Sequence, residues 1–300
     1  MNSTTQAPAE PLSRAHARPA RALIGWMPPE MAQGMLAGPG CQPPYTPEIV
    51  ARAASASAAL AARQPHPMAA NVVSDPPREL DAHIAELTAQ PFFRQFIAEG
   101  WQIRIADLRT VRALQPCIHT DHSAERTQGA RADDFVTLAR ITLPPTRAKE
   151  ILAAVATPDG RGWILTCRNP QLRIRGPNRA DRDDNGYKTK VFGIETEIVN
   201  SLVQVVRWRG VYVLRDGYHR THGLLSKGIT TVPVLYNEFP EQQPPLLAPG
   251  MIDPGVYSGE RAPLLVDYFD DHVSAAVEVR RTQKTFIIQV QVSELDTPIL

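Results

Sequence analysis

The sequence has little of several features that would narrow its function at once. It has three cysteines, Cys41, Cys117 and Cys167, and this odd, widely spaced set argues against a disulfide framework or a structural zinc site and fits a reducing compartment. It contains no run of about eighteen apolar residues and no continuous apolar segment near residue 1, so we expect neither a membrane span nor a secretory signal. The formal net charge is only +1, which gives no general attraction to nucleic acid or to anionic membranes. We therefore expect a cytoplasmic protein with no membrane partner.

The apolar content is sufficient for one substantial core. Hydrophobic residues make up 43% of the 300 positions, enough for a single core or a core with a small satellite. Residues 1–70 are rich in Ala and Pro, a composition that predicts a largely disordered arm with one helix, Pro47–Arg63. In that helix Thr46 is the candidate cap and Pro47 occupies the first helical position.

The remainder predicts a mixed α/β domain, of α+β type with a mixed sheet, over residues 75–240. Residues 241–300 are expected to form a linker and a C-terminal β-hairpin, which either adds strands to the main sheet or pairs with a second subunit as a homodimer contact. Outside the central stretch the expected elements are strands at Trp101–Leu108 and Phe135–Leu143, a helix at Phe192–Asn200, and hairpin strands at Val273–Val279 and Thr285–Val292.

The stretch Leu202–Tyr236 has the clearest pattern in the chain. Runs rich in Val and Tyr, with Gly at the points of reversal, predict two strands, a short helix and a third strand. The expected elements are Leu202–Arg207, Val211–Arg215, His219–Lys227 and Val232–Tyr236. Gly228 stands where a helix C-terminal glycine is expected.

The turn Asp216–Arg220 joins the second of these strands to the helix. The first N–H groups of a helix lack intrahelical partners and attract anions. His219 and Arg220 place positive charge at this end, where it is unfavourable unless an anion such as phosphate is bound. The alternative is that Asp216 caps the helix, Arg220 points into water and His219 packs against the sheet. Spacing alone leaves both interpretations open.

This turn, followed by a helix, Gly228-Ile229 and Val232-Pro233-Val234, resembles the nucleotide-binding box of the ParB/sulfiredoxin superfamily. Members have a G-x-x-R core after a strand, then a helix, a glycine and a strand with a "(V/I)P" pair. The resemblance covers about residues 202–236. It implies that the turn binds nucleotide phosphates, with ATP or CTP and Mg²⁺ as the ligand and with the nucleotide held by Gly217, Tyr218, His219, Arg220 and Thr221.

The sequence also departs from the members of that superfamily. Sulfiredoxin has its catalytic cysteine directly before the His-Arg pair, and this chain has Tyr218 there, so sulfinic acid repair is not expected. Partition proteins continue with a helix-turn-helix region, and no such pattern follows residue 237. The resemblance therefore supports nucleotide binding more than either of these activities.

Hydrolysis or phosphotransfer would need a carboxylate near the phosphate, as a general base or a Mg²⁺ ligand. Asp216, Glu195 and Glu197 are the catalytic candidates, and no spacing rule chooses among them. Two alternatives to an enzyme stay open. One is a non-catalytic module in which nucleotide switches a partner or nucleic-acid contact, and the other is a structural descendant that has lost its ligand.

Further polar clusters bear on nucleic acid and metals. The basic residues between Arg161 and Lys190 predict either a nucleic-acid contact or an exposed, salt-bridged loop, and the loop is favoured. His119, Asp121, His122 and Glu125, with His219 and His222, have residue types that ligate metals, but their spacing matches no recognised site. Residues Asp181–Gly186 resemble the start of a calcium loop, which fails at its twelfth position, Phe192. We expect no bound metal apart from Mg²⁺ brought by a nucleotide.

Overall fold

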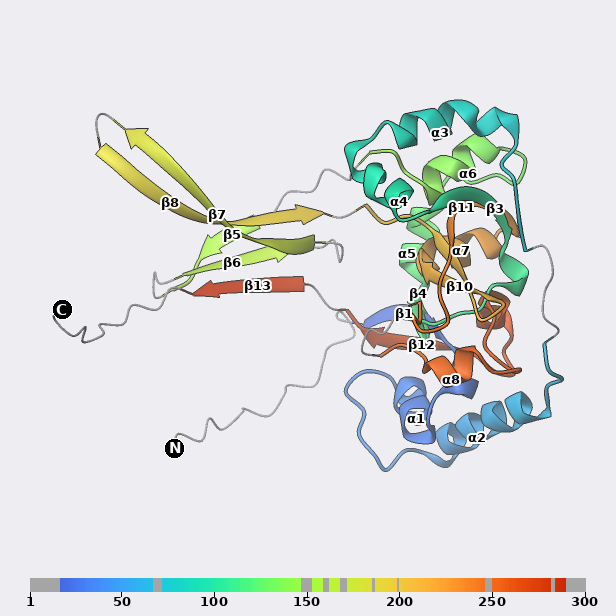
Figure 1. Cartoon of the computed structure of the whole chain (residues 1–300). Helices are drawn as coiled ribbons and strands as arrows, with labels where there is room; N and C mark the ends of the chain where they lie inside the picture. Colours follow the sequence, from blue (N-terminus) through green and yellow to red (C-terminus); the bar gives the residue numbers. More distant parts are fainter. Residues whose placement is uncertain are drawn as a thin grey trace. The chain divides into compact units, whose positions relative to one another are not determined.

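The computed structural model describes residues 17–66, 72–146, 153–158, 162–167, 172–184, 187–198, 200–245, 250–281 and 284–289 (Figure 1). The chain forms two compact units. Unit 1 comprises residues 1–145 and 201–281, and unit 2 comprises residues 146–200 and 282–300. Unit 2 is therefore an insertion in the sequence of unit 1 that is completed by the C-terminal segment.

The main sheet of unit 1 has five strands in the order β10-β9-β11-β3-β2. Its strands are β2 (Val73–Ser74), β3 (Gln102–Asp107), β9 (Gln204–Trp208), β10 (Val211–Asp216) and β11 (Thr231–Glu238). β9 and β10 form an antiparallel hairpin, and β11 runs parallel to β9 and antiparallel to β3. The sheet is thus mixed, because α7 carries the chain across from β10 to β11.

A second sheet of unit 1 joins segments that are far apart in the sequence. β1 (Ala17–Ala22) lies in the middle, with β12 (Ala275–Arg280) on one side and β4 (Cys117–His119) on the other. Both pairings are antiparallel.

The helices of unit 1 pack on these two sheets. The α-helices are α1 (Pro29–Ala37), α2 (Pro47–Ala62), α3 (Asp81–Thr88), α4 (Arg94–Ala98), α5 (Thr120–Arg126), α6 (Phe135–Thr142), α7 (Tyr218–Leu225) and α8 (Pro254–Tyr257). Short 3-10 turns are η2 (Ile24–Trp26), η3 (Arg78–Leu80), η4 (Pro91–Phe93), η5 (Leu108–Thr110) and η6 (Leu265–Phe269). In Figure 1, α3, α4 and α6 gather beside the five-stranded sheet, and α1 and α2 lie beyond the three-stranded sheet.

The buried residues in the described part of unit 1 form one large cluster and two smaller ones. The large cluster contains residues from all four elements of the central stretch, among them Val205, Val213, Leu224 and Val234. It also contains Tyr268 of η6. A second cluster joins alanines of β1 and α2 to Val277 of β12. The core of unit 1 therefore includes residues of the N-terminal region.

Unit 2 consists of strands in its described part. β5 (Ala153–Ala156), β6 (Gly162–Cys167) and β13 (Lys284–Gln289) form an antiparallel sheet in the order β13-β6-β5. β7 (Leu172–Asp184) and β8 (Tyr187–Ile198) form a separate long hairpin.

The mixed α/β class is confirmed, and the strand-strand-helix-strand order of the central stretch is as predicted. The helix expected at Pro47–Arg63 is α2. The expectation of a largely disordered arm is wrong for residues 17–66, because β1 pairs with β12 and Arg52 of α2 donates to the carbonyls of Asp271 and Ser274, all distant in the sequence. The contact pattern also divides the chain differently from the expected domain 75–240, since residues 146–200 belong to unit 2.

Three expected elements differ from the structure. Residues 135–142 form helix α6 rather than a strand, because Asp134 caps the helix by accepting from Thr137 N at 2.8 Å. Residues 192–198 belong to strand β8 rather than a helix, since β7 pairs with β8 along its length. The expected C-terminal hairpin is not formed, because β12 pairs with β1 and β13 pairs with β6. The dimer contact proposed for that hairpin therefore loses its basis.

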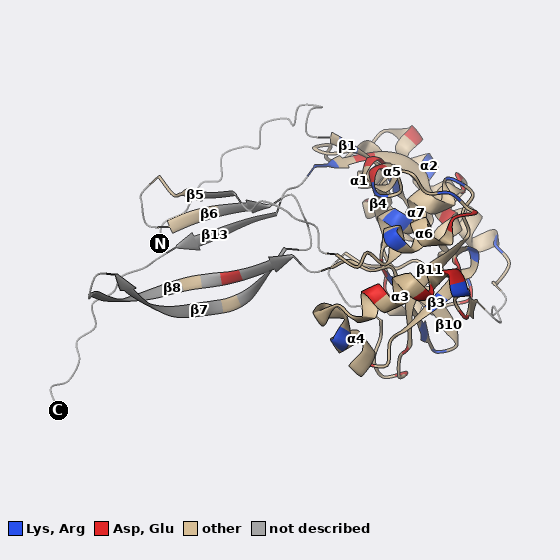
Figure 2. Ribbon diagram, turned by 90° about the horizontal axis from the view of Figure 1, so that it is seen from above, with Lys and Arg blue, Asp and Glu red and all other residues tan. Residues whose placement is uncertain are grey.

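Among the described residues, no helix combines the length and the apolar character needed to cross a membrane. In Figure 2 acidic and basic ribbon segments are interspersed over unit 1, in keeping with a net charge near zero.

Candidate functional site

The turn between β10 and α7 is built around Gly217. This residue has φ = 99°, in the left-handed region, and is the N-cap of α7. A Cβ added here would lie 2.7 Å from Cγ2 of Val203. Asp216 holds the turn, because its Oδ1 accepts from Gly217 N at 2.6 Å and its Oδ2 accepts from the Ser201 hydroxyl at 3.1 Å. Both carboxylate oxygens of Asp216 are therefore engaged in holding the turn.

Arg220 is buried, with 4% of its surface exposed, and does not point into water. Its guanidinium donates to the carbonyl oxygens of Ile141 at 3.1 Å and Thr142 at 3.2 Å, and to Oγ of Ser201 at 2.6 Å. Burial lowers the pKa of Arg220 to about 10, which leaves it charged at neutral pH. These bonds join the end of α6 to the turn, so they give Arg220 a positioning role.

Tyr218 and Thr221 are also bonded to the protein. The buried Tyr218 hydroxyl accepts from Leu114 N at 2.8 Å and donates to the Leu214 carbonyl, and burial raises its pKa well above the usual range. The Thr221 hydroxyl donates to the carbonyls of Tyr218 at 3.1 Å and Gly217 at 3.3 Å. These two side chains fix the turn and the start of the helix.

His219 is the one side chain of the turn that faces a cluster of ionisable groups. Its ring centroid lies 5.2 Å from that of His119 and 4.9 Å from that of His122. His119 is the N-cap of α5 and His122 lies in its first turn. We call these three residues the histidine cluster. The sequence around His119 and His122 showed that histidines gather there. Only the packing of α5 on α7 brings His219 next to them.

Gly223 makes that packing close. A Cβ at this position would lie 2.4 Å from the Ser123 carbonyl oxygen and 2.5 Å from Oγ1 of Thr127. Any larger residue would push α5 away from α7. The glycine therefore sets the spacing of the histidine cluster.

The charges around the cluster balance. Arg18 of β1 pairs with Asp121 at 2.9 Å, and Arg126 Nε donates to Nε2 of His122 at 3.3 Å. His122 Nδ1 lies 3.4 Å from the carboxylate of Glu125. Two guanidinium groups and two carboxylates thus surround three imidazoles.

Burial, and then the neighbouring imidazoles and guanidinium groups, lower the pKa of His219 to about 3. Burial lowers the pKa of His119 and of His122 as well. The cluster is therefore uncharged at neutral pH. In the described part of the chain, Nε2 of His219 is buried and has no hydrogen-bond partner.

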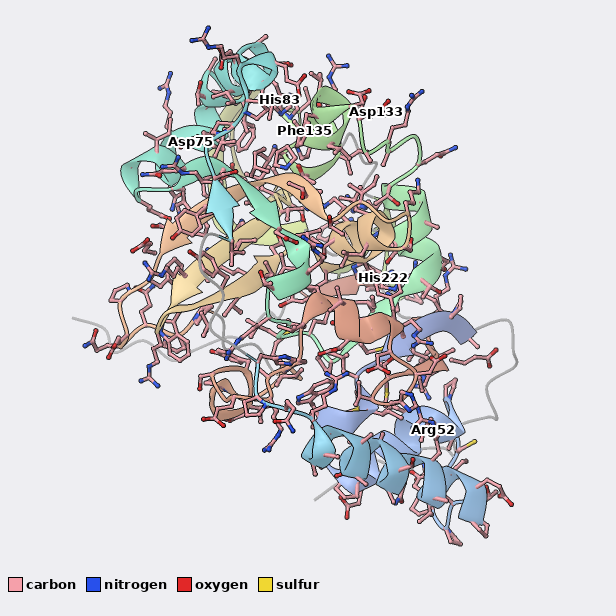
Figure 3. The ribbon with its side chains drawn as sticks, turned by 90° about the vertical axis from the view of Figure 1, so that its right-hand side faces the viewer. Arg52, Asp75, His83, Asp133, Phe135 and His222 are labelled. Carbon is pink, nitrogen blue, oxygen red and sulfur yellow. The ribbon has the colours of Figure 1, made fainter. Side chains whose placement is uncertain are left out.

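His222 is separate from the cluster. Its ring stacks on Phe269 at 4.6 Å between centroids and contacts the edge of Tyr268 at 6.0 Å. Both its nitrogens are buried without a partner among the described residues, and burial lowers its pKa to about 4. Figure 3 shows His222 inside unit 1. The structure thus brings three of the four histidines together, but over the described residues it places no group of three or more His, Cys, Asp or Glu side chains to hold a metal ion.

The structure does not bring the other two catalytic candidates together with Asp216 in one unit. Glu195 and Glu197 lie on β8 of unit 2, at register positions opposite Gly176 and Arg173. In the same register, Asp181 lies opposite Lys190 and Asp183 lies opposite Lys188. Much of the basic stretch of the sequence thus lies on strands β7 and β8.

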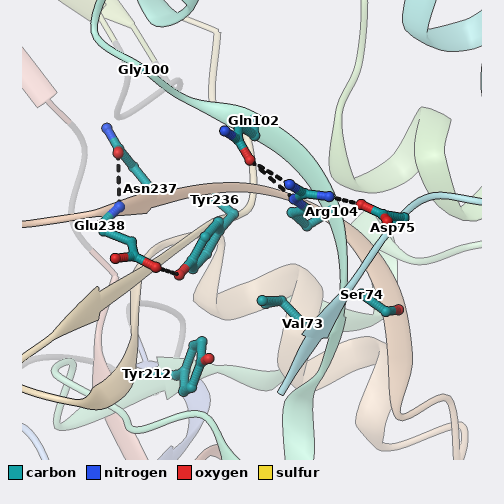
Figure 4. Close-up of a pocket in the computed structure, with 10 residues that line it drawn as sticks. All are labelled: Val73, Ser74, Asp75, Gly100, Gln102, Arg104, Tyr212, Tyr236, Asn237 and Glu238. Carbon is teal, nitrogen blue, oxygen red and sulfur yellow. Dashed lines mark hydrogen bonds and ion pairs between the residues drawn. The ribbon is translucent and has the colours of Figure 1, made fainter. Parts of the chain in front are cut away.

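Sequence reasoning missed a cavity of about 620 Å³ on the five-stranded sheet of unit 1 (Figure 4). Tyr212 of β10 and Tyr236 of β11 lie on it, with ring centroids 6.2 Å apart. Both tyrosines point to one face of the sheet because the strands are in register with β9 between them. The other lining residues are Val73, Ser74, Asp75, Gly100, Gln102, Arg104, Asn237 and Glu238.

Comparison with protein-family models, with curated proteins and with solved structures found no match for this chain.

Proposed function

We propose that this protein binds a phosphate-bearing ligand, most simply a nucleotide, at the histidine cluster and the first turn of α7. The observation that carries the proposal is the unpartnered, buried Nε2 of His219, set among two further imidazoles and near Arg18 and Arg126. The resemblance of the turn to nucleotide-binding sequences supports the same ligand class, with ATP or CTP and Mg²⁺ as the first candidates.

The histidine cluster is suited to an anion whose binding is accompanied by protonation of the imidazoles. The two guanidinium groups are balanced by carboxylates, so the neutral cluster exerts little net attraction. A phosphate beside the imidazoles would favour their charged forms and raise their pKa values. Backbone N–H groups at the start of α7 and the helix dipole add to the attraction. Binding is therefore expected to take up protons and to tighten as the pH falls.

In this proposal the residues of the turn have distinct roles. His219, with His119 and His122, contacts the phosphate. Gly217 shapes the turn, while Tyr218, Arg220 and Thr221 position it through bonds to the protein. Hydrolysis or phosphotransfer is a further hypothesis, for which Asp216 is the carboxylate in the same turn.

A second candidate is a structural descendant that binds no ligand. It is favoured by the three hydrogen bonds of Arg220, all of which go to protein acceptors. The two candidates differ in what His219 does, so the test is made at His219.

Thermal unfolding with inorganic phosphate, pyrophosphate, ATP, ADP, CTP and GTP, each with and without Mg²⁺, tests the proposal. A ligand at a hundred times its dissociation constant stabilises by about 2.7 kcal/mol, a rise of a few degrees in Tm. We expect such a rise for wild type, its loss in His219→Gln, and its retention in His272→Gln, a change at an exposed histidine.

The rise should be larger at pH 6 than at pH 8. Because phosphates also titrate in this range, the pH dependence is compared between wild type and His219→Gln. If no phosphate compound shifts Tm at either pH, the structural candidate stands and the proposal fails. A shift that His219→Gln retains would remove the histidine cluster as the site.

A further inference from the structure

The cavity on the five-stranded sheet contains an arrangement of aromatic and acidic groups that the phosphate proposal does not use. The rings of Tyr212 and Tyr236 lie 6.2 Å apart with 30° between their planes. Glu238 stands beside them and accepts from the Tyr236 hydroxyl at 2.8 Å. Asp75 lines the other side, with most of its side chain exposed.

The charges of the lining favour a cation. It contains two carboxylates, Asp75 and Glu238, and one guanidinium, Arg104, so its formal charge is −1. The face of a tyrosine ring also attracts cations, because its quadrupole is negative there. Burial, together with Glu238, raises the pKa of Tyr236, so its hydroxyl stays protonated and directs the carboxylate.

The cavity already binds one guanidinium group, that of Arg104, through Gln102 and Asp75. Oε1 of Gln102 accepts from Nε of Arg104 at 3.1 Å and from its terminal nitrogen at 2.7 Å. The remaining side of the group is paired with Asp75 (Figure 4). Arg104 is thus neutralised within the cavity. Glu238 is less completely paired, because its neighbour Arg207 lies 3.5 Å away and both side chains are substantially exposed.

We propose that this cavity binds an organic cation, an alkyl ammonium or guanidinium group, with its charge on Glu238 and its alkyl portion against Tyr212. The volume of about 620 Å³ accommodates a small molecule or the side chain of a peptide. Arg207 competes with the ligand for Glu238. This site is separate from the histidine cluster and does not depend on the phosphate proposal.

Isothermal titration of the full chain with agmatine and with spermidine tests the site, with acetate as the anionic comparison. Glu238→Gln keeps an oxygen for the Tyr236 hydroxyl but removes the charge, and it should weaken cation binding about tenfold or more. Tyr212→Ala should weaken binding about two- to fivefold through loss of the aromatic face.

Arg207→Gln provides the sharpest comparison, because it should change affinity in the opposite direction. Freed from its competitor, Glu238 should bind the cation about two- to fivefold more tightly. Glu241→Gln, an exposed acid outside the lining, should leave the affinity unchanged. Melting curves of each variant confirm that it is folded.

The proposal is overturned if agmatine and spermidine give no binding heat at about 10 mM. It is also overturned if Glu238→Gln binds them as tightly as wild type. Equal weakening by Glu238→Gln and Glu241→Gln would show general charge attraction instead of a site.

Discussion

The hydroxyl of Ser201 lies between Arg220 and Asp216, and Arg220 donates to it at 2.6 Å. The same hydroxyl donates to Asp216 at 3.1 Å. With the bonds from Arg220 to Ile141 and Thr142, this chain connects the end of α6, the start of the β9 segment and the turn before α7. The turn is held in place by residues that are distant in sequence.

Arg220→Ala should therefore act first on stability. It removes three hydrogen bonds, and although the Thr142 carbonyl keeps its bond from Val203 N, the Ile141 carbonyl and the Ser201 hydroxyl each lose a buried donor, at a cost of about 3 kcal/mol. Urea unfolding followed by circular dichroism measures the loss, with Arg140→Ala as the control at an exposed arginine. A stability within about 0.5 kcal/mol of wild type would contradict the positioning role.

Gly217→Ala should destabilise more than Gly228→Ala. Both glycines have positive φ, 99° and 75°, so alanine is strained at each. Only at Gly217 would the new Cβ meet a neighbour, 2.7 Å from Val203, whereas nothing lies within 4 Å at Gly228. We expect about 1 kcal/mol for Gly228→Ala and about 3 kcal/mol for Gly217→Ala from urea unfolding. Equal losses would mean that the contact with Val203 relaxes freely.

Tyr218→Phe should cost stability although it removes a single oxygen. The hydroxyl accepts from Leu114 N and donates to the Leu214 carbonyl, and both would lose their partner in a buried place. Leaving these groups unsatisfied costs about 1–3 kcal/mol. Tyr45→Phe, at a partly exposed tyrosine, is the control. Hydrogen exchange at Leu114 N should accelerate in Tyr218→Phe, and an unchanged rate would argue against the bond.

Acid should unfold the protein in part through His222. Its pKa is about 4 in the folded protein and 6.5 for an ordinary histidine, so between these pH values the unfolded chain binds more protons. The contribution of the uncharged His222 to the free energy of unfolding is fully present above pH 6.5. It is lost progressively as the pH falls toward 4. The gap between the two pKa values corresponds to about 3 kcal/mol.

The measurement is the free energy of unfolding in urea from pH 7 to pH 4, for wild type and for His222→Phe. Phenylalanine cannot take up a proton, so the decline with acid should be smaller in the variant. His272→Gln, at an exposed histidine, should follow wild type. A decline that is identical in His222→Phe would assign the acid sensitivity to other groups, His219 first among them because its pKa is also lowered.

Local patterns predicted the part of the fold whose signals are local. Gly217 and Gly228 mark the two ends of α7, and the Val-rich strands around it follow the expected alternation. The segment Phe135–Leu143 shows where such patterns mislead. A short apolar run fits a strand or a buried helix equally, and only the cap at Asp134 distinguishes the two.

The candidate site could be predicted only in its residue types. Neighbouring sequence identified His219 and Arg220 as basic residues at a helix start. Arg220 bonds to α6, about 80 positions away in the sequence, and His219 contacts the start of α5, about 100 positions away. Local sequence does not reveal either environment. The cavity that Tyr212 and Tyr236 help to line was missed for the same reason, since the two rings reach one cavity only when β9 lies between their strands.

The central position of β1 in its sheet has a consequence for how the protein is made. β1 ends at Ala22, but its partner strands end at His119 and Arg280. On the ribosome, β1 emerges before both of its partner strands and has no complete sheet to join until β12 has been synthesised. Such distant pairings raise the contact order and slow folding. The backbone of β1 therefore lacks its sheet partners during most of the synthesis of unit 1, and an unpaired strand of this kind is prone to aggregate.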